Sequence, residues 1–228
     1  MRDQFAGDIT DWLKFSLLRT LAAGDRSIGV AWYYIEDCAE AKLEDLDAEV
    51  ADALAAYRER SVSALERLAC WKSGTKFFRK HVPHPQFRNL WLEEMRSSLN
   101  ECDIVFLDPD NGLGNPDALH ATLDEIAAMR KSGRTIVLIH FPNHTEKQYL
   151  QIASHQEEIA RATEAESEFT IKTGVTVQRQ NPYGANMRLH RSRWFTVIDG
   201  DEVIRNRAKE FVAKLKKTGC SASIEPEY

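Results

Sequence analysis

Two short runs of apolar, β-forming residues constrain the fold of this chain more than any other feature. Asp103–Leu107 has the sequence DIVFL and Thr135–Phe141 has TIVLIHF, and neither run alternates with polar residues. Strands buried on both faces of a parallel sheet have this pattern. The residues between the runs, from about Asp117 to Lys131, have a helical pattern. We therefore predict a βαβ unit in which the two runs are adjacent, parallel strands in the sheet interior.

The rest of the chain continues this alternation. Further strands are predicted at 27–35, 75–79, 168–178 and 193–199, and further helices from Ile9 to before Gly24 and at 46–58, 61–70, 86–99, 145–163 and 201–216. The last two strands have no helix between them, so they predict an antiparallel pair at one edge. We expect a three-layer, Rossmann-like α/β fold with a mostly parallel sheet and an antiparallel C-terminal strand pair, formed by one domain over residues 1–228.

Composition sets the broad class of protein. The chain has 228 residues, of which 43% are hydrophobic, so it can build a sizeable core. No run approaches eighteen apolar residues and the N-terminus lacks an apolar leader, so we expect no membrane association. The four cysteines (Cys38, Cys70, Cys102 and Cys220) form no CxxC pair, which favours reduced thiols in the cytoplasm over a zinc site. The oligomeric state is left open.

Polar residues follow directly after the first apolar run. The segment 107–114 reads LDPDNGLG and contains Asp108, Asp110 and Asn111. In open parallel sheets, ligands bind outside the carboxyl ends of the strands. These three residues are therefore the candidate catalytic group, and a tight solvated turn is the alternative interpretation.

Two motifs resemble those of known methyltransferases. The DPDN sequence that begins at Asp108 resembles the [DNS]PP[YFW] motif of amino-group methyltransferases, and residues 5–15, FAGDITDWLKF, resemble the opening helix of the RlmJ-like 23S rRNA adenine-N6 methyltransferases. The resemblance implies a class I methyltransferase fold, which also ends its parallel sheet in an antiparallel hairpin. It implies S-adenosylmethionine as cofactor, a target amine oriented by Asp108, and a cofactor pocket lined by Lys14, Tyr33 and Glu36.

The chain departs from those motifs at several positions. Asp110 replaces the second proline, Asn111 replaces the base-stacking aromatic residue, and Phe15 replaces a histidine of the opening helix. The first predicted strand ends in the bulky sequence WYYIED instead of a glycine-rich loop. These departures leave open whether the cofactor is retained, and a catalytically inactive binding module of the same fold is one alternative.

A basic stretch supplies candidate substrate contacts. Residues 178–193 contain Arg179, Arg188, Arg191 and Arg193 and no acidic residue, although the whole chain has a net charge of −5. Arginine forks match phosphate groups, so we predict a projecting loop near Asp108 that holds RNA or DNA, with Arg188, Arg191 and Arg193 as contacts. A mobile loop paired with acidic neighbours is the alternative.

Two further assignments concern a histidine and a metal. His140 ends the second apolar run, so it is predicted to lie beside the Asp108 loop as a substrate contact or proton carrier. Methyl transfer requires no metal. In the rival interpretation Asp108 and Asp110 bind Mg²⁺, whose preferred ligands are carboxylate oxygens, and the protein is a metal-dependent phosphoesterase or nuclease.

Overall fold

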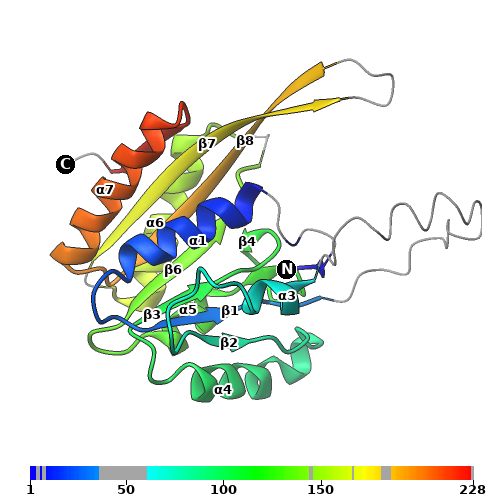
Figure 1. Cartoon of the computed structure of the whole chain (residues 1–228). Helices are drawn as coiled ribbons and strands as arrows, with labels where there is room; N and C mark the ends of the chain where they lie inside the picture. The colour runs from blue at the N-terminus through cyan, green and yellow to red at the C-terminus, as the bar shows by residue number, and fades with distance from the viewer. Residues whose placement is uncertain are drawn as a thin grey trace, which may run out of the picture.

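The protein is a three-layer α/β structure (Figure 1). A computed structural model describes residues 1–3, 6, 9–35, 61–143, 146–165, 167–180 and 186–226. The central sheet has seven strands in the order β2-β1-β3-β6-β8-β7-β9. Their bounds are β1 Ile28–Ala31, β2 Lys76–Phe78, β3 Ile104–Leu107, β6 Thr135–His140, β7 Glu168–Gln180, β8 Asn186–Ile198 and β9 Ser221–Glu225.

The predicted pair of core strands is confirmed. β3 and β6 are adjacent and parallel, with Ile104 opposite Thr135 and Leu107 opposite Leu138. Both strands are buried along their whole length, and β1 and β2 continue the parallel sheet on the other side of β3. The carboxyl ends of these four strands therefore meet at one edge of the sheet.

The C-terminal part of the sheet is antiparallel, as predicted, but more extensive than predicted. β8 is inserted between β6 and β7 and runs antiparallel to both. The stretch expected to be a loop at 178–193 is mostly strand, because β7 and β8 pair from Glu168↔Ile198 to Gln180↔Asn186. β9, a strand the sequence did not predict, pairs with the outer side of β7.

Helices cover both faces of the sheet. The remaining elements are α1 Ile9–Leu21, α3 Val62–Glu66, η3 Pro85–Phe87, α4 Arg88–Ser98, α5 Leu123–Met129, α6 Gln148–Thr163, α7 Glu202–Lys217 and a small two-stranded sheet of β4 Gly112–Leu113 and β5 His120–Ala121. α1 and α7 pack on one face, with Leu17 and Phe211 in their shared core. α4, α5 and α6 pack on the other face, with Met95, Ile126 and Ile159 in its core.

Several predicted elements have different bounds. The helix expected at 117–131 is only Leu123–Met129, because Thr122 forms a capping box with Glu125 and fixes the start of α5. The helix expected at 61–70 is the short α3, and the strand expected at 27–35 ends at Ala31. The helix expected at 46–58 lies outside the described residues.

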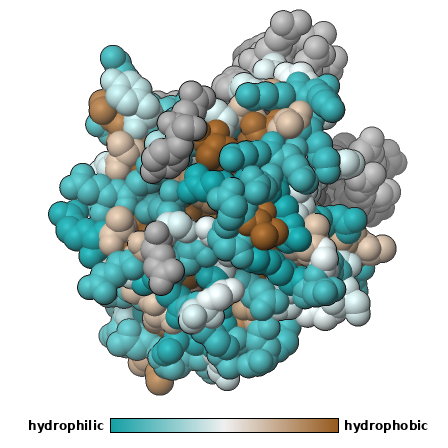
Figure 2. All heavy atoms as spheres, turned by 90° about the vertical axis from the view of Figure 1, so that its left-hand side faces the viewer, coloured by the Kyte–Doolittle hydropathy of each residue, from teal (hydrophilic) through white to brown (hydrophobic). Residues whose placement is uncertain are grey.

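The surface fits a globular fold. Figure 2 shows one face, which is mostly hydrophilic with scattered hydrophobic residues. Among the residues that the structure describes, no helix is long and apolar enough to cross a membrane.

Candidate functional site

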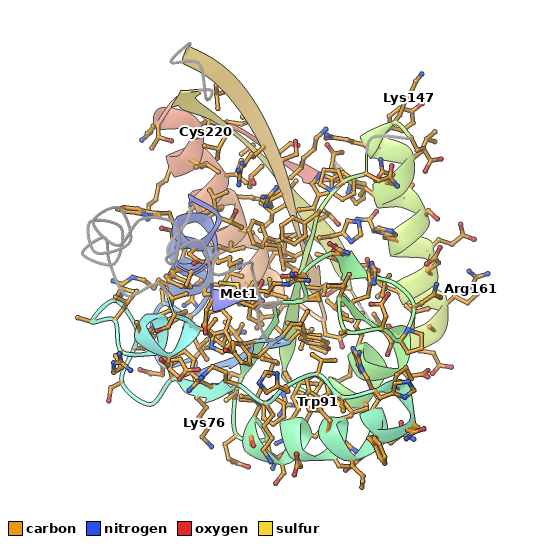
Figure 3. The ribbon with its side chains drawn as sticks, turned by 90° about the vertical axis from the view of Figure 1, so that its right-hand side faces the viewer. Met1, Lys76, Trp91, Lys147, Arg161 and Cys220 are labelled. Atoms are coloured by element: carbon orange, nitrogen blue, oxygen red, sulfur yellow. The ribbon has the colours of Figure 1, made fainter. Side chains whose placement is uncertain are left out.

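A cavity of about 400 Å³ lies at the carboxyl edge of the parallel strands. It is lined by Met1, Arg2, Thr10, Asp11, Lys14, Asp108, Pro109, Asp110, Asn111, Leu119, Phe141, Arg191 and Arg193. Figure 3 looks onto this edge, with Met1 near the middle of the view and α6 at one side between Lys147 and Arg161. The cavity joins the start of α1, the segment after β3, the end of β6 and the base of the β7–β8 hairpin. Asp108, Asp110, Asn111 and Lys14 therefore meet in one place.

A buried ion triad forms the floor of the site. The Lys14 Nζ lies 2.9 Å from Asp108 Oδ2 and 3.2 Å from Asp11 Oδ1. All three side chains are at most 4% exposed. Burial by itself lowers the pKa of Lys14, but the charges of Asp108 and Asp11 outweigh it, so the pKa is raised well above its ordinary value. Lys14 is therefore a permanent cation that fixes the Asp108 carboxylate.

Asp110 and Asn111 stand beside the triad. Asp110 lies 3.3 Å from Arg2 Nε and 3.3 Å from the Met1 amino group. The Asn111 backbone N–H donates to the Leu119 carbonyl at 2.8 Å, which connects the segment after β3 to the residue that precedes β5. Asp110 is thus held by cations, whereas Asn111 is more exposed at the cavity wall.

A second buried network holds that segment from behind. The Arg88 guanidinium binds the Glu125 carboxylate and donates to the carbonyls of Asp117 and His120. The Tyr33 hydroxyl donates to Glu125 Oε2 at 3.0 Å, so its side chain belongs to this network and is not part of the cavity wall. Burial raises the pKa of Tyr33, and the neighbouring Glu125 carboxylate adds to the rise. Glu36, the other predicted cofactor residue, lies outside the described residues.

His140 lies next to the site but is not among the residues that line it. Its Nδ1 accepts a hydrogen bond from the Leu113 N–H at 3.2 Å, and its ring stacks on Trp194 and contacts His155. Gly112 passes so close that a Cβ there would meet the imidazole at 2.1 Å. Burial and the nearby His155 lower the pKa of His140 to about 3, so the ring is neutral. It connects β6 to the β4 segment.

The arginines of β8 are divided by the structure. Arg191 and Arg193 line the cavity, as predicted for residues near Asp108. The Arg193 guanidinium lies 4.4 Å from the centre of the Phe141 ring, and its Nε donates to Thr10 Oγ1 at 3.3 Å. Arg188 is described only by its backbone, further out along β8.

Three lining residues with polar side chains were not predicted as site residues: Thr10, Asp11 and Arg2. The i,i+3 spacing of Asp11 and Lys14 in the first turns of a helix was a usable signal for Asp11. For Arg2 the sequence offers no signal. In the part of the chain that is described, no group of three His, Cys, Asp or Glu side chains is arranged to hold a metal ion.

Comparisons with known proteins leave the chemistry to the site itself. No protein-family model matches the chain, and no curated protein matches it. A solved precorrin 8w decarboxylase from Methanobacterium thermoautotrophicum is similar over 87% of this chain and 95% of its own, with 10% identity and a TM-score of 0.41. A precorrin-6y C5,15-methyltransferase from Geobacter metallireducens GS-15 is similar over 82% of this chain and 87% of its own, with 12% identity and a TM-score of 0.35. At these scores neither similarity bears on the reaction of this chain, and the Rossmann-like assignment rests on the sheet topology.

Proposed function

We propose that this protein is an S-adenosylmethionine-dependent methyltransferase that acts on an amine of a nucleotide or nucleic acid. The observation that supports this most is the hydrogen bonding of the Asp108 carboxylate. Its Oδ2 is fixed by Lys14, while no described residue donates to its Oδ1, and the residue lines the cavity at the end of β3. A carboxylate that is held in place through one oxygen, at the carboxyl end of a strand, can accept an N–H of a target amine with its other oxygen.

The cavity fits a zwitterionic cofactor. S-adenosylmethionine carries a sulfonium, an amino group and a carboxylate, and the lining offers the carboxylate of Asp110 as well as the guanidinium groups of Arg2 and Arg191. The volume of about 400 Å³ lies within the usual range of small-molecule sites. The bulky residues after β1 leave this space open, because Tyr33 is turned toward Glu125 and Trp32 is buried in the core.

The residues of the chain would act by positioning. When bound, the cofactor would supply the methyl group and leave as S-adenosylhomocysteine, and the methylated nitrogen would lose one N–H proton to water. Asp108 orients the nitrogen lone pair of the amine by accepting one of its N–H groups, and Lys14 with Asp11 keeps that carboxylate in place. Holding two reactants in a productive geometry accounts for much of the acceleration of a bimolecular transfer.

Calorimetry and a transfer assay test the proposal together. Binding of S-adenosylmethionine and S-adenosylhomocysteine is measured for the wild type and for Asp108→Asn, and methyl transfer to adenine- and cytosine-containing oligonucleotides is followed with labelled cofactor. We expect Asp108→Asn to bind the cofactor nearly as well and to lose at least about tenfold in turnover, since one charge-assisted hydrogen bond is worth about 1.5–3 kcal/mol. Asp25→Asn, which changes an exposed acid in the turn after α1, is the matched control. Failure of the wild type to bind either compound would refute the proposal, and binding without transfer would indicate a binding module.

A second candidate function is favoured by one observation. The carboxylates of Asp11, Asp108 and Asp110 line the same cavity, and carboxylates hold the cation of a metal-dependent phosphoesterase, although these three are not arranged as a three-ligand metal site. The Lys14 ammonium, however, occupies the position between Asp11 and Asp108 that a bridging cation would take. If Asp108→Asn and Asp110→Asn abolish a hydrolytic activity equally and excess Mn²⁺ partly restores it, the metal mechanism replaces methyl transfer.

A further inference from the structure

The β7–β8 hairpin extends well beyond the sheet (Figure 1). β6 pairs with β8 only at Trp194–Ile198 in the sheet, and its partner residues are 136–140. β9 pairs with β7 only at Thr170–Gly174. Beyond these positions, residues 175–180 and 186–191 pair only with each other among the strands that the structure describes. We call these two segments the arm. Six residues at about 3.3 Å each make it roughly 20 Å long.

The charge of this region is opposite to that of the rest of the protein. Residues 172–198 contain five basic residues and no acidic one. The rest of the chain has 25 basic and 35 acidic residues, so its formal charge is −10. Register places Arg179 opposite Met187 and Arg188 opposite Gln178, both in the outer half of the arm. A local concentration of arginine on a projecting element points to a polyanionic partner.

The base of the arm is fixed and leads into the cavity. Arg193 packs on Phe141 and hydrogen-bonds Thr10, while the Gln148 side chain of α6 donates to Ser192 Oγ at 3.3 Å. Arg191 and Arg193 then line the cavity that contains Asp108. Basic residues therefore continue from the outer arm to the candidate site, as a partner with regularly spaced phosphates would require.

We infer that the arm binds the phosphate backbone of a single-stranded nucleic acid and directs one of its bases toward Asp108. Single strands are favoured because a base amine inside a duplex is stacked and cannot reach a buried carboxylate without being flipped out. This inference rests on the proposed function and names its substrate class. Binding of the nucleic acid is measured without cofactor, so the inference and the proposed function can fail separately.

The test is fluorescence anisotropy with a labelled mixed-sequence oligonucleotide of about 20 nucleotides, as RNA and as DNA. The arm variant Arg179→Gln/Arg188→Gln is compared with the control variant Arg67→Gln/Arg161→Gln. The control makes the same substitutions at two exposed positions, Arg67 directly after α3 and Arg161 on α6. We expect the arm variant to weaken binding at about 50 mM salt by at least about tenfold and the control by less than about twofold. The salt dependence should also fall by about 1.4 in log–log slope, as expected for two lost phosphate contacts on a single strand.

Further measurements distinguish single-strand binding by the arm from duplex binding and from self-association. Arg179→Lys/Arg188→Lys keeps the charge and should restore most of the affinity, and unchanged circular dichroism should show that the glutamine variant is folded. Tighter binding to a matched duplex, or equal weakening in arm and control variants, overturns the inference. So does light scattering that shows a wild-type dimer at low salt which the arm variant lacks, because the arm would then bind the acidic surface of a second copy.

Discussion

Replacing Lys14 by methionine would leave the Asp11 and Asp108 carboxylates buried together without their shared cation. Their nearest oxygens lie 3.2 Å and 2.9 Å from the Lys14 Nζ, so these oxygens are at most 6.1 Å apart. Two unit charges at that separation repel by about 3 kcal/mol at an effective dielectric constant of about 20. Removing one partner of a buried ion pair typically costs about 3–5 kcal/mol. We therefore expect Lys14→Met to lower the free energy of unfolding by about 3–5 kcal/mol near pH 7.

Urea denaturation followed by tryptophan fluorescence measures this loss. Lys209→Met makes the same change at an exposed helical position and should alter the free energy of unfolding by no more than about 0.5 kcal/mol. The double variant Asp11→Asn/Lys14→Met removes one of the repelling charges, so it should recover about 3 kcal/mol relative to Lys14→Met.

The raised pKa of Lys14 also predicts how the stability of the wild type depends on pH. The pKa of Lys14 is raised, so its stabilisation is fully present below the ordinary lysine value of 10.5 and is lost only as the pH rises beyond it. Two results would refute the reasoning. One is a loss of stability in Lys14→Met that is no larger than the loss in Lys209→Met. The other is a loss in Asp11→Asn/Lys14→Met that equals the sum of the losses in Asp11→Asn and Lys14→Met.

Three further predictions concern stability. Gly112→Ala should destabilise by several kcal/mol, well beyond the roughly 1 kcal/mol of Gly133→Ala, since both glycines have positive φ but only Gly112 would press a Cβ into His140; thermal melts compare them. His140 has its pKa lowered to about 3, so the wild type should lose stability as the pH falls below about 6.5, and urea titrations should show a shallower loss in His140→Asn. Both carboxylate oxygens of Glu168 are buried without a hydrogen-bond partner among the described residues, and desolvation raises the pKa of Glu168 to about 8. Stability should therefore fall as the pH rises from about 4.5 through 8. The free energy of unfolding of Glu168→Gln relative to the wild type should be higher at pH 8 than at pH 5, and an equal difference at both pH values would contradict this.

The centre of the sheet was predictable because its signal is local. The uninterrupted apolar runs of β3 and β6 can be satisfied only by burial on both faces, and that placed Asp108 at the carboxyl edge. β9 was missed because SASIE is short and largely polar, and it is a strand only through its pairing with β7. Its conformation depends on a tertiary contact that no local pattern encodes.

The candidate site was predictable in part. The motif comparison named Lys14 and Asp108, and the structure joins them at 2.9 Å across 94 positions of sequence. Tyr33 and His140 show what was not predictable. Each follows or ends a buried strand, and the partner that decides its orientation comes from another element: Glu125 for Tyr33 and the Leu113 N–H for His140. Sequence spacing places a residue at an edge, but it does not determine which neighbour will satisfy its polar atom.

The insertion of β8 between β6 and β7 has a consequence for synthesis on the ribosome. β7 emerges first but cannot join β6 directly, because the place beside β6 belongs to β8. The apolar strand Thr135–His140 therefore keeps an open edge until Ile198 has been added, 58 residues after His140. At roughly 5–20 residues per second this interval lasts about 3–12 s. During that interval a buried strand of the finished protein is an exposed template for pairing with other chains, so the nascent chain is most prone to aggregation just before the hairpin closes.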